Sequence, residues 1–147
     1  MTTTTKSSPP SLTVLGFDFG LKKMGIAVGQ TITQTASPIE IIRVQNGELP
    51  KAQLSRLLST WKPNAIVIGI PLNMDGTVSA ISEYAETFAK FLETESQLPV
   101  HRVDERLTTK NARYELDMIR ERTNSKQKEQ LLDAMAACLI VESWLKR

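Results

Sequence analysis

Short apolar runs typical of β-strands occupy the first third of the chain. The first run covers residues 12–19, and the link G-L-K-K separates it from a second run at 24–28. Two apolar runs joined by so short a link that contains glycine predict an antiparallel hairpin. A third run, 37–44, carries three isoleucines. The pattern therefore predicts a three-strand antiparallel meander.

After the meander, segments whose apolar residues have helical spacing alternate with two further predicted strands. The run A-I-V-I-G-I at 65–70 is almost wholly apolar, which is typical of a central strand covered on both faces. A second short strand covers 100–103. The predicted helices cover about 49–61, 78–92, 108–120 and 127–145.

This order of elements predicts an α/β fold. Three antiparallel strands are followed by parallel strands that helices connect, so we expect a mixed sheet with helices on both faces. Ligands of such sheets gather beyond the carboxyl ends of the parallel strands. Asp18 lies near the end of the first predicted strand, and Asp104 and Glu105 follow the strand 100–103. These carboxylates can therefore converge.

Residues 1–11 are mostly threonine, serine and proline, which predicts a disordered tail without the apolar stretch of a signal peptide. Residues 12–147 have the length of one domain. No segment approaches the roughly 20 apolar residues that span a bilayer. The single cysteine, Cys138, excludes a disulfide framework within the chain and is expected in the core. We expect a cytoplasmic protein without a membrane partner.

Asp18, the pair Asp104 and Glu105, and Asp133 are acidic residues within apolar elements. Desolvation penalises each carboxylate there unless a cation binds, so the pattern predicts a metal site. Small alanines beside Asp133 would let the last helix approach the sheet closely. A solvated helix edge is the alternative for Asp133, and a plain hairpin turn is the alternative for Gly20 after Asp18.

The net charge of +2 permits nucleic-acid binding without requiring it. Lys22 and Lys23 lie in the turn that follows Asp18. Residues 102–128 contain eight basic residues and five acidic ones. The eight are Arg102, Arg106, Lys110, Arg113, Arg120, Arg122, Lys126 and Lys128. Arg106 and Lys126 are the best candidates for phosphate contacts, because they lie next to a proposed metal ligand or on its helical face. Ordinary helix charge pairs are the alternative, above all for Arg113 and Arg120.

The loop P-L-N-M-D-G-T at 71–77 predicts a turn that caps the following helix through Asp75 or Thr77. Asn73 is a candidate for an additional hydrogen bond to a nucleic-acid backbone. The one histidine, His101, has no second imidazole with which to share a transition metal, so we expect a surface or strand-edge position.

Four motifs together carry a resemblance to a known family. They are D-F-G-L-K-K-M-G-I-A-V at 18–28, I-G-I-P-L-N-M-D-G-T at 68–77, D-E-R-L-T-T at 104–109 and D-A-M-A-A-C-L-I at 133–140. In this order they resemble the YqgF/RuvX family, described as Holliday-junction resolvases and as nucleases of ribosomal RNA maturation. One departure is Lys23, where the family usually has arginine, which forms a planar bidentate fork that lysine lacks.

The resemblance implies a ribonuclease H-like fold and a metal-dependent nuclease with catalytic Asp18, Glu105 and Asp133, which bind the metal together with Asp104. Carboxylates suit Mg²⁺ or Mn²⁺, and two such ions can support phosphodiester hydrolysis. Three functions stay open: maturation of the 5′ end of pre-16S rRNA, cleavage of branched DNA, which needs a symmetric dimer, and RNA binding in ribosome assembly without cleavage. The partner in each case is a nucleic acid, and the protein is a monomer or a homodimer.

Overall fold

A five-stranded sheet forms the centre of the molecule. The computed structural model describes residues 11–73, 75–105 and 125–147, and within 125–133 it describes the helix backbone alone. The strands are β1 (Thr13–Asp18), β2 (Lys23–Gln30), β3 (Thr35–Arg43), β4 (Ala65–Ile70) and β5 (Val100–Asp104). The helices are α1 (Lys51–Trp61), α2 (Ala80–Ser96) and α4 (Ser125–Leu145).

The strand order β3-β2-β1-β4-β5 confirms the mixed sheet predicted from the sequence. β1 pairs antiparallel with β2, and β2 with β3, so the first three strands form the expected meander. β4 pairs parallel with β1 and with β5. The carboxyl ends of β1, β4 and β5 therefore meet at one end of the sheet, together with the start of β2 and the end of β3.

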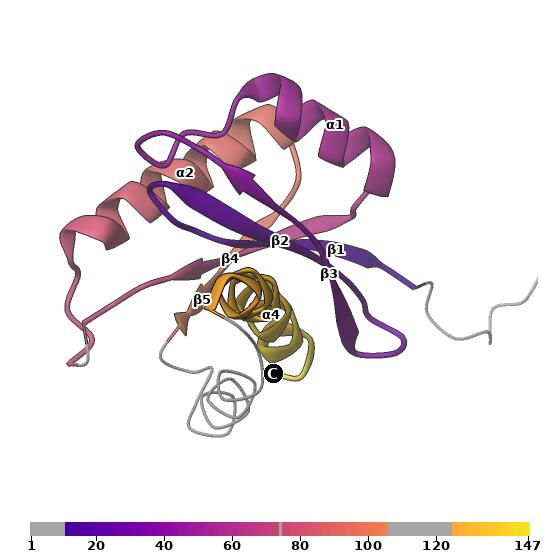
Figure 1. Cartoon of the computed structure of the whole chain (residues 1–147). Coiled ribbons are helices and arrows are strands. Elements are labelled where there is room, and N and C mark those ends of the chain that lie inside the picture. Colours follow the sequence, from indigo (N-terminus) through magenta and orange to yellow (C-terminus); the bar gives the residue numbers. More distant parts are fainter. Residues whose placement is uncertain (1–10, 74, 106–124) are drawn as a thin grey trace, which may run out of the picture.

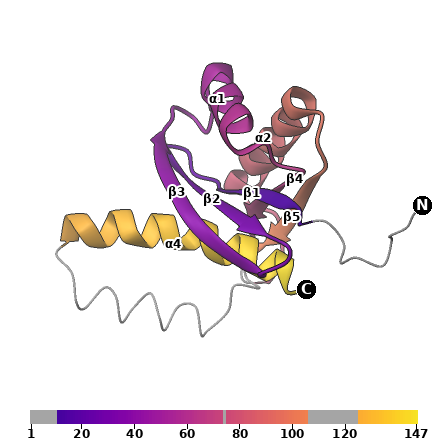
Figure 2. The same ribbon diagram turned by 90° about the vertical axis from the view of Figure 1, so that its right-hand side faces the viewer.

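Helices cover both faces of the sheet, as expected. Figures 1 and 2 show α1 and α2 on one face and α4 on the other. Strand residues alternate between the two layers: Leu15 and Phe17 pack under α1 and α2, whereas Val14 and Val67 pack against α4. β4 is buried along most of its length because both of its faces are covered, which explains its almost wholly apolar sequence.

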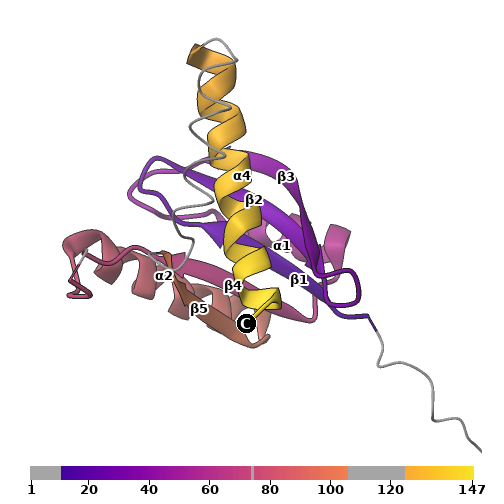
Figure 3. The same ribbon diagram turned by 90° about the horizontal axis from the view of Figure 1, so that it is seen from below.

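Glycines of the sheet allow α4 to approach it closely. A Cβ atom added to Gly16 would overlap Val141, and one added to Gly29 would lie 2.5 Å from Val141 Cγ1 and 3.1 Å from Leu145 Cδ1. Ala137 is fully buried against the same face. Small residues on both sides of the interface thus support the predicted close approach of this helix, which crosses the underside of the sheet in Figure 3.

Most predicted elements occur within a few residues of their expected bounds. The helix expected at 108–120 lies outside the described residues.

Cys138 is buried, and this burial raises the pKa of its thiol to about 11, which agrees with a core role. His101 lies on the edge strand β5 and packs against Trp144 at 4.8 Å between ring centroids. Among the helices of the described residues, none is long and apolar enough to cross a membrane.

Candidate active site

Asp18 ends β1 between two glycines. Its register partners are Gly25 on β2 and Gly69 on β4. Neighbouring strands lie only about 4.8 Å apart, so residues at these two positions are the nearest cross-strand neighbours of the Asp18 side chain. Because both are glycine, neither strand places a side chain beside the carboxylate, and the space around it is left for other groups.

Glu105 directly follows β5 and lies against Gly69. A Cβ atom added to Gly69 would lie 2.9 Å from Glu105 Oε1 and 3.0 Å from Glu105 Cγ. Gly69 is also the β4 partner of Asp18. Because Gly69 has no side chain, there is room beside it for the carboxyl groups of both Asp18 and Glu105.

Asp18 and Glu105 form a side-chain hydrogen bond, and both are half-buried. A hydrogen bond between two carboxyl groups requires one of them to carry a proton. Burial raises the pKa of Glu105, the bond with Asp18 opposes this increase, and the negative charge of Asp104 adds to it. The pair thus holds a proton more tightly than an exposed carboxylate does.

The chemistry of this pair fits a divalent cation. Two half-buried carboxylates in contact supply hard oxygen ligands, and a cation between them removes the repulsion that otherwise favours protonation. Metal binding would then release the shared proton. In the described part of the chain, no group of three or more acidic, histidine or cysteine side chains is placed to hold a metal ion. A third ligand would have to come from elsewhere.

The path of α4 over β1 indicates where Asp133 lies. Leu145 packs beside Gly29, which is the register partner of Val14 near the start of β1. Ala137 lies nearer the end of β1, with its carbonyl oxygen close to Gly16. Because helical positions four residues apart share a face, Asp133 is one turn beyond Ala137 on this stripe, toward the end of β1 that carries Asp18. The side chain of Asp133 is outside the described residues.

Replacing Glu105 with glutamine is expected to stabilise the metal-free protein at neutral pH. The folded-state pKa of Glu105 is raised above its ordinary value of 4.5. The protonated form is therefore favoured by folding, and its contribution to stability is present below pH 4.5 and is lost as the pH rises through the folded-state pKa. Glutamine keeps a neutral group at every pH.

Chemical unfolding in the presence of a chelator, measured between pH 4 and pH 8, checks this expectation. The free energy of unfolding of Glu105→Gln should exceed that of the wild type at pH 7, and the difference should shrink toward pH 4. A variant less stable than the wild type at pH 7 would contradict the destabilising effect of the buried charge.

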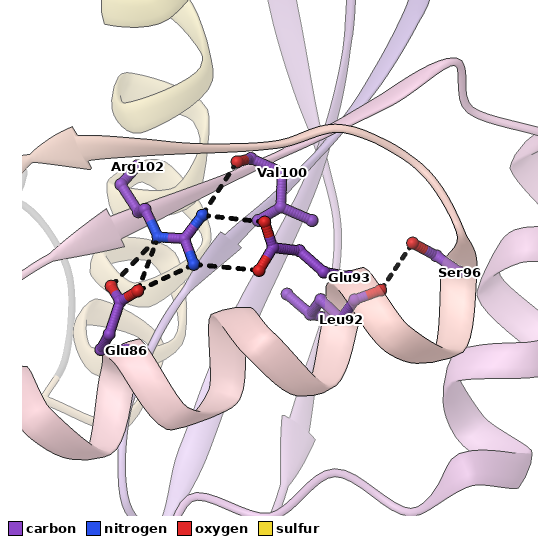
Figure 4. A network of polar contacts seen from close by, with 6 residues as sticks. All are labelled: Glu86, Leu92, Glu93, Ser96, Val100 and Arg102. Carbon is purple, nitrogen blue, oxygen red and sulfur yellow. Dashed lines mark hydrogen bonds and ion pairs between the residues drawn. The ribbon is translucent and has the colours of Figure 1, made fainter.

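Arg102, one of the basic residues considered for substrate binding, serves the fold instead. Its guanidinium nitrogens lie 2.8–3.2 Å from the carboxylate oxygens of Glu86 and Glu93 on α2 (Figure 4). These hydrogen bonds raise the pKa of Arg102 and lower that of Glu93. The sequence did not reveal this role, because the partners belong to a helix that only the fold brings to β5.

We expect Arg102→Ala to lower the free energy of unfolding by about 0.5–1 kcal/mol, since these ion pairs are partly exposed to solvent and screened. Nucleic-acid affinity and its salt dependence should not change, because the charge is already neutralised by two carboxylates. Thermal unfolding and a salt titration of binding test both points. Loss of affinity without loss of stability would restore the substrate-binding role.

The described residues of the loop 71–77 form the predicted turn, but the helix cap predicted at Asp75 or Thr77 is wrong. Asp75 Oδ1 accepts hydrogen bonds from the backbone N–H and the hydroxyl of Thr77, which stabilises the turn itself. The helix begins later, at Ala80, and Ser79 caps it in a capping box with Ser82. Asn73 Nδ2 donates to Thr77 Oγ1 at 2.9 Å, so its amide supports the loop.

The remaining candidate cations are only partly described. Lys22 is exposed in the β1–β2 turn, and Lys23 begins β2 at the same end of the sheet as Asp18. Arg106 lies outside the described residues, as does the side chain of Lys126, whose backbone belongs to α4. Sequence reasoning missed Gly69, although a glycine within the apolar run of β4 signals a close approach of other groups.

Comparison with known proteins identifies relatives over almost the whole chain. The family model described as "RuvX: Holliday junction resolvase" matches residues 12–147. A protein of Pseudomonas putida named "Putative pre-16S rRNA nuclease" is 47% identical over 133 residues, which cover 90% of this chain and 94% of that protein. A protein of Coxiella burnetii with the same name is 43% identical over 139 residues, 92% of this chain and 94% of that protein.

Solved structures share the fold at lower identity. "T. thermophilus RuvC in complex with Holliday junction substrate" superposes with a TM-score of 0.58 at 16% identity, covering 92% of this chain and 95% of that one. The Holliday junction resolvase of fowlpox virus gives a TM-score of 0.53 at 17% identity, covering 92% and 99%. These similarities confirm the ribonuclease H-like fold expected from the sequence.

Proposed function

Because the chain belongs to the RuvX family of Holliday junction resolvases, we propose that it is a divalent-metal-dependent nuclease that matures the 5′ end of pre-16S rRNA. The observation that carries this proposal is the hydrogen-bonded pair of Asp18 and Glu105 over Gly69. Two carboxyl groups held together at the carboxyl ends of parallel strands are suited to binding cations that act on a phosphodiester.

The acidic residues have distinct tasks in this proposal. Asp18, between the two glycines, would hold the cation together with Glu105, which follows β5, and Asp133 would supply a further ligand from α4. Asp104 adds negative charge beside Glu105. When bound, Mg²⁺ or Mn²⁺ activates water and neutralises the charge that develops on the phosphate. The half-buried carboxylates would orient the cations, because the backbone of the sheet fixes the distance between the two carboxylates.

Substrate binding depends on the basic residues around the acidic end of the sheet. Lys22 and Lys23 lie in and after the β1–β2 turn, and Arg106 and Lys126 are expected to contribute from the other side. Asn73 is expected to add a backbone contact from the loop after β4. Contacts of this kind position a nucleic acid without reading its sequence.

The relatives favour RNA over DNA. Proteins that match almost the whole chain at 41–47% identity carry a name that refers to pre-16S rRNA. The two resolvase structures named above are only 16–17% identical to this chain, so they support the fold rather than the substrate. Cleavage of branched DNA is the second candidate, because the family description names it.

A cleavage assay tests the proposal and separates the candidates. Purified protein is incubated with an end-labelled fragment of pre-16S rRNA or with a four-way DNA junction, in Mg²⁺, Mn²⁺ or a chelator. We expect metal-dependent cleavage of the RNA that Asp18→Asn abolishes. Cleavage of the junction alone would establish the resolvase, and binding without cleavage of either substrate would establish an assembly factor. Equal activity in the chelator would contradict the metal dependence.

A further inference from the structure

A hollow of about 670 Å³ lies at the end of the sheet that carries the acidic pair. Lys22 from the β1–β2 turn and Arg43 from the end of β3 line it, together with Glu48 and with Pro50, the residue before α1. The hollow lies on the β3 side of β1, whereas Glu105 lies on the β5 side. Arg43 is not among the residues proposed above to bind the metal or the substrate.

Register places Arg43 on the same face of the sheet as Asp18. Arg43 pairs with Lys23, the first residue of β2. The preceding pair, Met24 and Ile42, belongs to the core under α1 and α2. Because side chains alternate along a strand, Arg43 and Lys23 point to the opposite face, the one that carries α4. Asp18 follows the core residue Phe17 and points to this face as well.

The charge of Arg43 is available for a ligand. Two other described cations on the helix layer are neutralised: Arg56 lies 2.5 Å from Glu40, and Lys51 lies 3.8 Å from Glu95. Among the ion pairs between described residues, none involves Lys22 or Arg43. Both side chains are exposed.

The hollow carries a net positive charge from its described side chains. Two cations, Lys22 and Arg43, face one carboxylate, Glu48. An anionic ligand is therefore favoured.

We propose that this hollow binds a phosphate of the RNA strand next to the one that is cleaved, with Arg43 as its principal contact. β3 lies two strand spacings, about 10 Å, from β1, so Arg43 is too far from Asp18 to contact the reacting phosphorus and lies where a neighbouring phosphate would pass. The inference rests on the proposed nuclease function and adds the direction of the strand, which leaves the acidic pair across β2 toward β3.

Salt-dependent binding tests the contact apart from cleavage. Affinity for a fluorescein-labelled single-stranded RNA is measured by anisotropy in a chelator at several salt concentrations. Arg43→Ala should weaken binding and reduce the slope of log K against log salt by about 0.7, the value for one phosphate contact on a single strand. Arg43→Lys should restore the slope, because lysine keeps the charge.

Arg56→Ala is the matched control, since it removes the same charge from an arginine already paired with Glu40. Its slope should equal that of the wild type. An unchanged slope in Arg43→Ala, or an equal reduction in both variants, would overturn the phosphate site. Failure of the nuclease proposal would appear separately, as RNA binding without cleavage by the wild type in Mg²⁺ or Mn²⁺.

Discussion

Gly69→Ala is expected to reduce cleavage by about 100-fold, although the change adds only one methyl group. The new Cβ would lie 2.9 Å from Glu105 Oε1 and 3.0 Å from Glu105 Cγ, so the side chain of Glu105 has to leave its present position beside Gly69. A displacement of about 1 Å in a catalytic group can cost about 100-fold in rate. The turnover rate should fall more than substrate affinity, because the phosphate contacts lie elsewhere.

The same substitution also costs stability, so a control has to separate the two effects. The added Cβ would lie 2.6 Å from Ile140 Cδ1 on α4, and overpacking of this kind costs about 1–3 kcal/mol. Gly29→Ala produces a similar clash, 2.5 Å from Val141 Cγ1, at a position whose nearest atoms belong to Val141, Leu145 and Thr35. We expect both variants to lose stability and Gly69→Ala alone to lose cleavage per folded molecule.

Cleavage rates on labelled RNA, measured well below the unfolding temperature of each variant, decide between these outcomes. Equal activity of the two alanine variants would show that Gly69 does not position Glu105. A restored rate at high Mn²⁺ concentration would instead agree with displacement of a metal ligand, since excess metal compensates for a weakened site by mass action.

Asp18→Asn is expected to abolish cleavage while the protein stays folded. Loss of a group that only orients a metal ligand lowers metal affinity or activity by about 10–100-fold, so loss of a proposed ligand itself should lower cleavage by more than about 100-fold. Asparagine has nearly the same shape, and its two cross-strand neighbours are glycines, so no packing is disturbed. The unfolding temperature of the metal-free variant should equal or exceed that of the wild type, because one of two repelling carboxylates is gone.

Asp75→Asn provides the matched control for this substitution. Asp75 is exposed, lies in the turn after β4 and accepts hydrogen bonds from Thr77. Cleavage kinetics and a metal titration followed by calorimetry should show loss of both activity and metal binding in Asp18→Asn and neither loss in Asp75→Asn. Undiminished cleavage by Asp18→Asn would refute the assignment of the site.

Local patterns were sufficient to predict the elements of this fold. Apolar runs of alternating or continuous type located all five strands, since burial on one or both faces of a sheet constrains neighbouring residues in the chain. Helix ends were predicted less well. The cap of α2 was placed at Asp75 or Thr77 rather than Ser79, because several small polar residues in succession can each cap a helix, and contacts of the preceding loop select one.

The sequence also indicated that Asp18, Glu105 and Asp133 matter, because carboxylates in apolar surroundings are costly without a cation. It also predicted that Asp18 and Glu105 converge beyond the carboxyl ends of parallel strands. Asp18 and Glu105 are far apart in the chain, and the parallel pairing of β1, β4 and β5 brings their strands to one end of the sheet. Gly69 then leaves room for both side chains, and only the register of the folded sheet shows that this glycine lies beside Asp18 and Glu105.

The roles of the basic residues were decided by tertiary structure alone. Arg102 and Arg43 are both arginines at or near strand ends, and nothing in their neighbouring residues separates them. The fold places Glu86 and Glu93 of α2 against Arg102, whereas Arg43 lines a hollow on the opposite edge of the sheet. Composition and periodicity thus determined the elements and the type of chemistry. The long-range pairing of strands determined which charges are neutralised within the protein and which remain to bind a substrate, since electrostatic partners depend on distance in space.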